Sequence, residues 1–295
     1  MSNHLIRRIT VLGTGLIGGS FALALRKHLS DIYLAGWDRP EIVRDAKVRS
    51  AFDDTFSGDL RPALAKADLV YLALPIGVTL DLLPEIAGHV TASALVTDAC
   101  STKLRIMEEA APHFRDAAGA IFLGGHPMAG KELSGIAAAE PELFHGHPYA
   151  LIAEGEAVAM PAAAEPRIAA FIKILEKIGA QPLWIGAQQH DYAVALASHL
   201  PQLASVALAS FLYDRLDENG LPITLAGPGL RDSLRLAGSP YSTWRDIVLT
   251  NRELLSASLD LFARRLDELR ERLASRDLEA DFDSANELYK LLRSL

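Results

Sequence analysis

The chain has 295 residues, half of them hydrophobic, so it is long enough to form two domains with sizeable cores. Its formal net charge of -8 gives no basic footprint for nucleic acid or an anionic membrane, and we expect a small-molecule ligand. Cys100 is the only cysteine, which excludes an internal disulfide and a thiolate metal cluster, and we expect no metal. No apolar run is long enough to span a bilayer and no signal region precedes the first strand, so we expect a cytoplasmic protein.

A glycine fingerprint follows the first predicted strand. An apolar, β-branched run at residues 9–12 leads into Gly-Thr-Gly-Leu-Ile-Gly at residues 13–18 and then into a predicted helix. This order is typical of a dinucleotide-binding unit. Gly13 permits the tight turn, Gly15 lets a pyrophosphate approach the backbone, and Gly18 lets helix and strand pack closely. The start of the helix supplies unpaired N–H groups for the phosphates.

The second predicted strand, residues 32–37, ends in Asp38, about 20 residues beyond the fingerprint. A carboxylate here can accept hydrogen bonds from a ribose and would repel the extra phosphate of NADP. NAD is therefore favoured as cofactor, although Arg39 could stack on adenine or pair with that phosphate. We assign the cofactor site to Gly13, Thr14, Gly15, Leu16, Ile17, Gly18, Asp38, Arg39, Pro75 and Ser101.

Predicted strands and helices alternate up to Gly186. The strands are expected at 68–74, 94–97, 120–123, 149–153 and 182–185, and the helices at 59–66, 78–89, 103–111 and 167–178. This alternation predicts an α/β Rossmann-type N-terminal domain, residues 1–186, with a parallel sheet covered by helices on both faces. The alanine-rich stretch 158–164 is expected to be a loop or the start of a helix.

His126 lies in a glycine-rich loop, residues 124–132, directly after the predicted strand 120–123. Open α/β sheets bind their ligands at the carboxyl ends of the strands, so the imidazole is placed where chemistry is expected. Lys131 and Glu132 place two opposite charges at the end of this loop. A histidine that is hydrogen-bonded only for structure explains this stretch equally well.

Ser101 follows another predicted strand end. Ser101 or Thr102 can cap the next helix, or the Ser101 hydroxyl can point into the crevice of His126 and orient a substrate hydroxyl. Cys100 is expected to pack rather than react, because no activating neighbour is evident.

Residues 187–295 show helical patterns only and are expected to form an all-helical substrate and dimerisation domain. In the long helical pattern 188–218, Pro201 should kink or break the helix and aim His199 into a cleft, unless His199 simply faces solvent beside the kink. Arg231 and Arg235, four residues apart, share a helical face. One can grip an anionic ligand while the other pairs with a carboxylate, or both form surface ion pairs.

Residues 241–274, which include Trp244, contain neither proline nor glycine and are predicted to form one long helix. At about 1.5 Å per residue, this helix would extend beyond a domain of this size. Its surplus apolar face predicts a homodimer through the helical domain. A last helix, residues 278–295, could cover that interface.

With these motifs in place, the chain resembles the prephenate dehydrogenase family of tyrosine biosynthesis, which includes arogenate dehydrogenases. The resemblance covers nearly the whole chain and rests on residues 13–20, 98–103, 125–132, 198–201 and 231–251. The blocks around His126 and from Arg235 to Trp244 are its most specific parts. Gln202 and Leu234 depart from it, since histidine and threonine are frequent there.

The resemblance implies NAD-dependent oxidative decarboxylation of prephenate to 4-hydroxyphenylpyruvate, with arogenate as the alternative substrate. It implies that His126 accepts the hydroxyl proton and that Ser101 holds the same hydroxyl. Further roles implied are ring carboxylate binding by Arg235, placement of the acidic side chain by His199, and a gate or ionic pair of Lys131 and Glu132 at the mouth of the site. Trp244 is implied either to pack near the substrate or to support Arg235. With neither a mutase nor a regulatory domain evident, any feedback by tyrosine would have to act at the active site.

Two other interpretations compete. Related β-hydroxyacid dehydrogenases usually need a catalytic lysine in the second domain, whereas the lysine and arginine positions in 188–275 are all arginine. A non-catalytic nicotinamide-sensing dimer would need only the glycine loop and Asp38. The joint presence of Ser101, His126, His199 and Arg235 therefore favours an enzyme.

Overall fold

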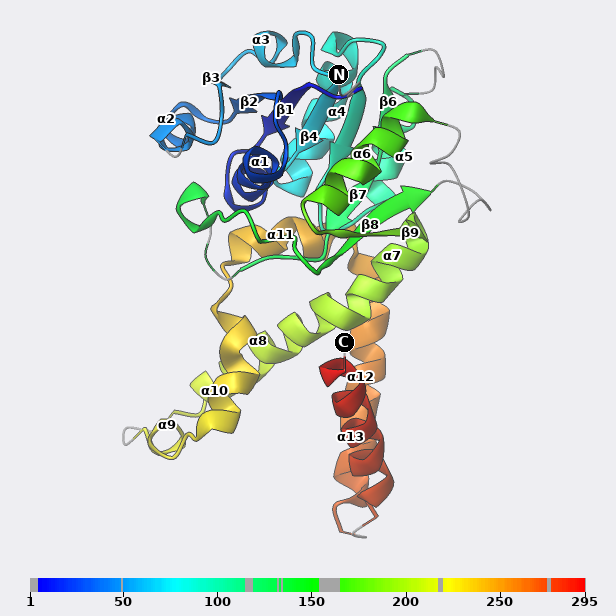
Figure 1. The fold of residues 1–295 in the computed structure, drawn as a ribbon. Coiled ribbons are helices and arrows are strands. Elements are labelled where there is room, and N and C mark those ends of the chain that lie inside the picture. Colours follow the sequence, from blue (N-terminus) through cyan, green and yellow to red (C-terminus); the bar gives the residue numbers. More distant parts are fainter. Residues whose placement is uncertain are drawn as a thin grey trace.

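The computed structural model describes residues 5–48, 50–114, 119–131, 133, 135–153, 165–216, 220–274 and 277–294. The N-terminal half is built on a six-stranded parallel sheet of order β3-β2-β1-β4-β5-β6 (Figure 1). Its strands are β1 (Arg8–Leu12), β2 (Tyr33–Trp37), β3 (Asp54–Phe56), β4 (Leu69–Leu72), β5 (Leu95–Asp98) and β6 (Ile121–Leu123). The strand order reverses between β1 and β4, which is where an open α/β sheet forms its ligand crevice.

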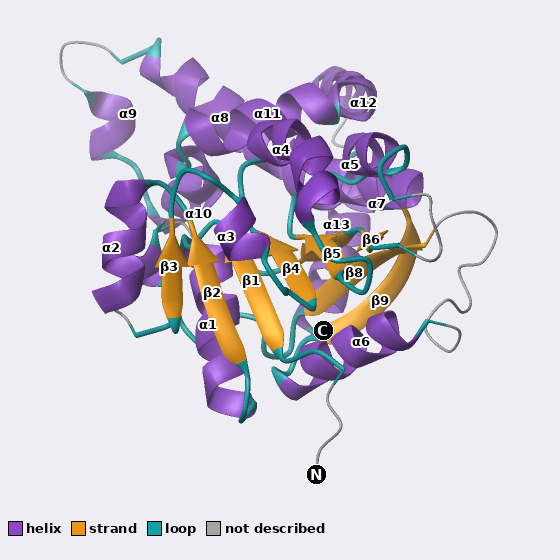
Figure 2. Ribbon diagram, turned by 90° about the horizontal axis from the view of Figure 1, so that it is seen from above, coloured by secondary structure: helices purple, strands orange, loops and turns teal. Residues whose placement is uncertain are grey.

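Helices cover both faces of this sheet (Figure 2). They are α1 (Leu16–His28), α2 (Pro40–Val48), α3 (Arg61–Leu64), α4 (Ile76–His89), α5 (Leu104–Ala110) and α6 (Pro166–Lys177). Ile9 and Val11 pack with Phe21 of α1 on one face, and Val70 packs with Leu83 of α4 on the other. The predicted Rossmann-type fold is confirmed; α2 and β3 are elements that the sequence pattern does not predict. The stretch 158–164 lies outside the described residues.

A second, three-stranded sheet carries His126. Strand β7 (Gly125–Pro127) pairs antiparallel with β8 (Pro148–Ala153), which pairs parallel with β9 (Gln181–Gly186). The expectation of a single parallel sheet and of a loop at His126 is wrong. A Cβ on Gly125 would lie 2.6 Å from the backbone oxygen of Asp98, so the chain passes too close to β5 for a side chain and turns away from the first sheet.

The second half is all-helical, as predicted, and extends as two arms (Figure 1). Helix α7 (Ala187–Val194), a π-helical turn η2 (Ala195–His199) and α8 (Leu200–Tyr213) are continuous. Pro201 therefore does not break the helix. The wide turn before it accommodates the ring and the missing N–H, which a regular α-helical turn cannot do. The remaining elements are α9 (Leu221–Thr224), α10 (Pro228–Leu234), η3 (Arg235–Gly238), α11 (Tyr241–Thr250), α12 (Arg252–Arg272) and α13 (Glu279–Arg293).

The predicted single helix over residues 241–274 is wrong, because the chain leaves helical geometry at Asn251, with φ -119° and ψ 28°. The buried Asn251 amide donates to the backbone oxygen of Asp191 at 2.9 Å and lies 3.2 Å from Nδ1 of His199. These contacts fix the break between α11 and α12.

Among the described residues, one helical stretch, Ala187–Tyr213, is long and apolar enough to cross a membrane. This finding differs from the expectation that no apolar run of the chain is long enough to span a bilayer. Length and composition are weak evidence for a span, and here the stretch buries His190, Asp191 and His199 in contacts with neighbouring elements.

Candidate active site

The glycine fingerprint forms a cradle between β1 and α1. Gly13 has φ +92°, and a Cβ there would lie 2.3 Å from the backbone oxygen of Ala73. A Cβ on Gly18 would lie 1.9 Å from the backbone oxygen of Gly13, so α1 packs directly on the turn. Nothing lies within 4 Å of the Cβ position of Gly15. Open backbone at a helix N-terminus fits a pyrophosphate.

Asp38 lies beside this cradle, at the end of β2. Its Oδ2 accepts the backbone N–H of Thr14 at 2.7 Å, and its Oδ1 accepts that of Arg39 at 2.8 Å. The carboxylate is thus held where ribose hydroxyls can donate to it. The Arg39 guanidinium is exposed and lies 3.5 Å from Glu41. Pro75 follows the neighbouring strand β4 as the N-cap residue of α4, and Leu16 and Ile17 open α1.

A buried ion pair fixes the end of β5 against β7. The Asp98 carboxylate accepts the backbone N–H of Cys100 at 2.9 Å and of Gly125 at 3.0 Å, and it pairs with the Lys103 ammonium. Lys103 also donates to the backbone oxygen of Gly125 at 2.6 Å. Buried charges need such additional partners, and together these bonds anchor the residue that precedes His126.

The prediction that Ser101 or Thr102 caps the helix after β5 is wrong. Helix α5 is capped by Asp191, whose Oδ1 and Oδ2 accept the backbone N–H groups of Lys103 at 2.7 Å and Leu104 at 2.9 Å. The Thr102 hydroxyl instead lies 2.8 Å from that of Thr250, and Ser101 is half-buried in the loop. Neither Ser101 nor Thr102 is therefore the cap.

The Cys100 thiol is buried and lies 3.4 Å from the Thr79 hydroxyl. Burial raises the pKa of the Cys100 thiol far above its ordinary value. As predicted, this thiol packs and is not a nucleophile, since the thiolate is the reactive form.

His126 lies at the end of a chain of polar side chains that the sequence does not reveal. Its Nδ1 is 2.9 Å from Nε2 of His190, and Nδ1 of His190 is 2.8 Å from Oδ1 of Asp191. The two imidazole rings meet edge to face, with centroids 5.1 Å apart. Burial, reinforced by His190, Lys103 and His199, lowers the pKa of His126 well below its ordinary value, so the ring is neutral at pH 7.

His199 is buried between α11 and α12 rather than exposed on a cleft wall, with 1% of its surface accessible. Its ring meets Trp244 edge to face at a centroid distance of 5.8 Å. Nδ1 faces the Asn251 amide. Burial lowers the pKa of His199 to about 4.

This shift predicts a loss of stability in acid. Between the ordinary value of 6.5 and about 4, the unfolded chain binds a proton at His199 that the folded chain does not. The free energy of unfolding therefore falls as the pH falls through this range, by up to about 3 kcal/mol from this group. Urea unfolding at several pH values should show it, with a flatter slope in His199→Gln. Equal slopes in the two proteins would contradict the assignment.

The other predicted substrate residues, Arg235 and Lys131, lie on different elements from His126. Arg235 opens η3 and is exposed, and η3 is bound to α8 by a 2.8 Å hydrogen bond from the Gln202 amide to the backbone oxygen of Leu236. Gln202 follows His199 by one helical turn. Lys131 pairs with Glu140 at 2.6 Å, whereas Glu132, its predicted partner in a gate, lies outside the described residues.

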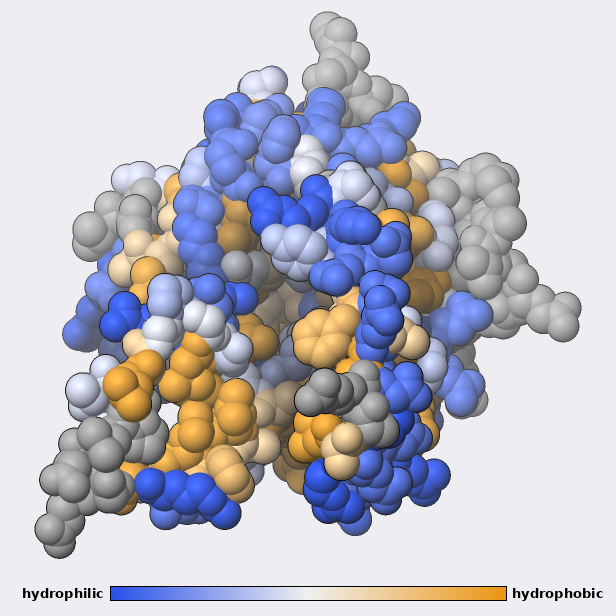
Figure 3. Space-filling view, turned by 90° about the horizontal axis from the view of Figure 1, so that it is seen from below, coloured by the Kyte–Doolittle hydropathy of each residue, from blue (hydrophilic) through white to orange (hydrophobic). Residues whose placement is uncertain are grey.

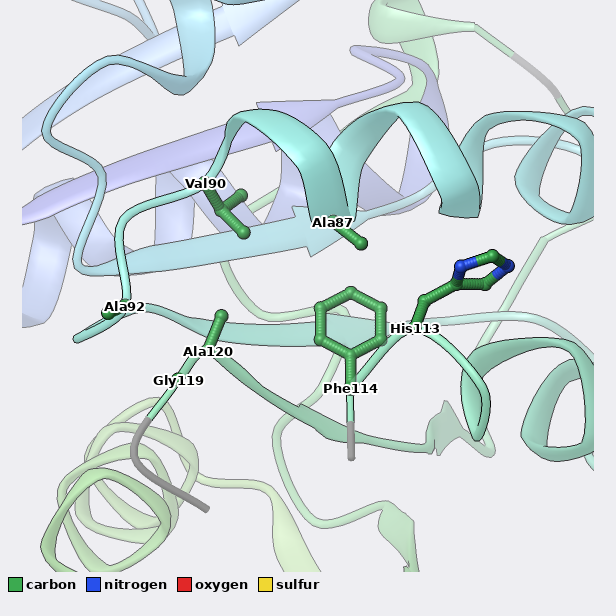
Figure 4. A pocket seen from close by; sticks show the side chains of 7 residues that line it. All are labelled: Ala87, Val90, Ala92, His113, Phe114, Gly119 and Ala120. Atoms are coloured by element: carbon green, nitrogen blue, oxygen red, sulfur yellow. The ribbon is translucent and has the colours of Figure 1, made fainter. Parts of the chain in front are cut away.

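A pocket of about 250 Å³ lies elsewhere, at the amino ends of β5 and β6 (Figure 4). Its lining residues are Ala87, Val90, Ala92, His113, Phe114, Gly119 and Ala120. This lining is mainly small and apolar with one titratable side chain. The carboxyl ends of the strands, with His126, lie at the opposite edge of the sheet, so this pocket is not the candidate site.

A Rossmann cradle, an acidic residue at the end of β2 and a neutral histidine at the carboxyl edge of the sheet together define a nucleotide-binding dehydrogenase. The particular family follows from comparison with known proteins. Residues 21–182 match the family described as "Prephenate dehydrogenase, nucleotide-binding domain" and residues 186–293 match "Prephenate dehydrogenase, dimerization domain". The chain belongs to the prephenate dehydrogenase family, an oxidoreductase family of tyrosine biosynthesis, and the predicted resemblance is confirmed.

Individual relatives agree. The chain is 32% identical to prephenate dehydrogenase of Lactococcus lactis, over 93% of this chain and 73% of that one. It is 30% identical to cyclohexadienyl dehydrogenase of Zymomonas mobilis, over 92% and 90%. Among solved structures, prephenate dehydrogenase from A. aeolicus with hydroxyphenyl propionate and NAD+ is similar at a TM-score of 0.85, with 25% identity and 98% coverage of both chains. Synechocystis arogenate dehydrogenase is similar at a TM-score of 0.74, with 31% identity over 97% of this chain and 96% of that one.

Proposed function

We propose that the chain is an NAD-dependent prephenate dehydrogenase that converts prephenate to 4-hydroxyphenylpyruvate. The observation that carries this proposal is the position of His126, whose neighbour Gly125 is anchored by Asp98 and Lys103 at the carboxyl edge of the sheet that holds the dinucleotide cradle. The named activity of the L. lactis relative and the NAD+ complex of the A. aeolicus enzyme support it. A carboxylate at Asp38 favours NAD over NADP.

His126 and Ser101 have different roles in the proposed reaction. Bound in the cradle of Gly13, Gly15 and Asp38, NAD would supply the acceptor for the hydride that leaves C4 of the substrate. His126 takes the proton of the C4 hydroxyl and, being neutral at pH 7, is in the form that can do so. Ser101 holds that hydroxyl in line. As the C1 carboxylate leaves as carbon dioxide, its electron pair makes the ring aromatic, and His126 returns its proton to the phenolic oxygen.

Arg235→Gln is expected to weaken substrate binding, because Arg235 is proposed to grip the ring carboxylate. Trp244, which the buried His199 meets edge to face, is proposed to pack near the substrate. Loss of a charged hydrogen bond costs about 1.5–3 kcal/mol, which corresponds to a rise in KM of roughly 10- to 150-fold. Steady-state kinetics measures it, with Arg231→Gln on the exposed α10 as matched control. An unchanged KM in Arg235→Gln would remove this residue from the site.

The substrate is tested directly by nicotinamide reduction with prephenate and with arogenate, each offered NAD and NADP in separate reactions. Turnover of prephenate with NAD is the expected result. Arogenate is the second candidate, because the Synechocystis arogenate dehydrogenase is 31% identical over nearly the whole chain. Preference for arogenate would change the substrate and keep the chemistry, whereas binding of NAD without any turnover would favour the sensor interpretation.

We further propose a homodimer formed through the helical domain, residues 187–295, which begins where β9 passes into α7. Apolar side chains gather on both arms (Figure 3). Examples are Phe211, 50% exposed, on α8 and Leu292, 62% exposed, on α13. Monomeric proteins rarely expose large apolar patches, and the match to a dimerization domain supports pairing here. We also propose a cytoplasmic location, since the single cysteine is a free buried thiol.

A further inference from the structure

The contact between Asp191 and His190 determines where the His190 proton lies. Both carboxylate oxygens of Asp191 accept backbone N–H groups at the start of α5, so Asp191 acts as an acceptor in this network. Its Oδ1 also lies 2.8 Å from Nδ1 of His190. An acceptor at that distance requires a donor opposite it, so the proton of His190 lies on Nδ1.

The same matching of hydrogen-bond donors with acceptors determines the proton position on His126. A neutral imidazole has one donor and one acceptor nitrogen, so His190 with its proton on Nδ1 presents a bare Nε2. That nitrogen lies 2.9 Å from Nδ1 of His126, which must then donate. We propose that Asp191 and His190 are positioning residues that fix His126 as the Nδ1–H tautomer and leave its Nε2 lone pair to accept the substrate proton.

The opposite arrangement is unfavourable on this geometry. If His126 carried its proton on Nε2, a neutral His190 would donate from Nε2 and turn a bare Nδ1 toward Asp191. Two acceptors would then face each other at 2.8 Å, with both residues buried. The remaining alternative is a doubly protonated His190, which would donate from Nε2, make Nδ1 of His126 an acceptor and put the His126 proton on Nε2.

The consequence for catalysis rests on the proposed role of His126. A ring with a proton already on Nε2 cannot take one there from a hydroxyl, whereas the Nδ1–H tautomer can. On transfer, the substrate O–H bond breaks, an N–H bond forms at Nε2, and the new charge is stabilised by the existing donation from Nδ1 to His190. The proton on Nδ1 stays in place throughout.

The tautomer can be measured in the free protein without any substrate. Ring ¹⁵N–¹H correlation spectra of ¹⁵N-histidine-labelled protein, with His126 assigned through His126→Asn, are expected to show a protonated Nδ1 and a bare Nε2. A protonated Nε2 on His126 near pH 7 would overturn the proposal. Because no turnover is involved, this outcome is independent of whether prephenate is the substrate.

Two variants separate positioning from a merely structural role. His190→Gln keeps an oxygen that can accept from Nδ1 of His126, whereas His190→Leu does not. We expect His190→Leu to lower kcat roughly 10- to 100-fold, part of what a general base supplies, with unchanged KM for NAD and a mixed tautomer at His126. His190→Gln should keep the Nδ1–H tautomer and most of kcat, and His89→Gln, on the exposed end of α4, should match the parent protein. Equal kcat losses in both His190 variants without a change of tautomer would overturn the proposal.

Discussion

Replacing His126 by asparagine is expected to lower kcat roughly 10²- to 10⁴-fold, because asparagine is polar but cannot take the hydroxyl proton. Affinity for NAD should change little, since Gly13 and Gly15 lie in the turn between β1 and α1 and Asp38 directly follows β2, apart from β7. Steady-state nicotinamide reduction and a separate titration with NAD measure the two effects. The measurement is best made near pH 7, where the parent histidine is neutral.

A matched replacement of the exposed His89 by asparagine controls for general effects of losing an imidazole. If the His126 variant turned over near the parent rate, His126 would not be the proton acceptor. If affinity for NAD fell as steeply as kcat, the histidine would instead support the cofactor cradle.

Gly18→Ala and Gly15→Ala are expected to fail in different ways. A Cβ on Gly18 would lie 1.9 Å from the backbone oxygen of Gly13 and 2.7 Å from the Val11 side chain. Neither the turn nor β1 can move freely, so we expect a loss of unfolding free energy above about 3 kcal/mol. At Gly15 nothing lies within 4 Å, and φ is -73°, which alanine adopts easily.

Gly15→Ala should therefore keep stability within about 1 kcal/mol but raise KM for NAD at least tenfold, because its methyl group occupies the approach of the pyrophosphate. Urea unfolding and cofactor titration of both variants give the comparison. Unchanged affinity for NAD in Gly15→Ala would place the pyrophosphate elsewhere, and a stable Gly18→Ala would show that the turn can relax.

The sequence predicts most of the Rossmann half because its signals are local: β-branched runs, glycines at fixed spacing and Asp38 at a strand end. It does not predict β7, since Gly-His-Pro has no strand periodicity and pairs only because β8 lies alongside. The break at Asn251 is missed for a related reason. Asparagine in a helical pattern looks exposed, and its contact with Asp191, 60 residues earlier, exists only in the folded chain.

In the candidate site, too, the residues with a local sequence signal are predicted and those that depend on distant contacts are not. His126 and Ser101 stand out because they follow strand ends, where α/β sheets place their ligands. His190 and Asp191 look like ordinary polar residues of a helix. Their importance comes from a contact between His190 and a residue 64 positions earlier. A His-Asp pair shortly before His199 was the available signal, and it is too common to identify a site alone.

The single carboxylate of Asp191 has a consequence for how the two halves can move. It belongs to the helical half, yet it caps a helix of the cofactor half and holds the ring that faces His126. A hinge at Gly186 could not open without uncovering the start of α5 and drawing His190 away from His126. These contacts join the two halves around His126. A fragment that ended at Gly186 would lack the His190 and Asp191 side chains that are proposed to orient His126, so the proposed chemistry needs both halves of the chain.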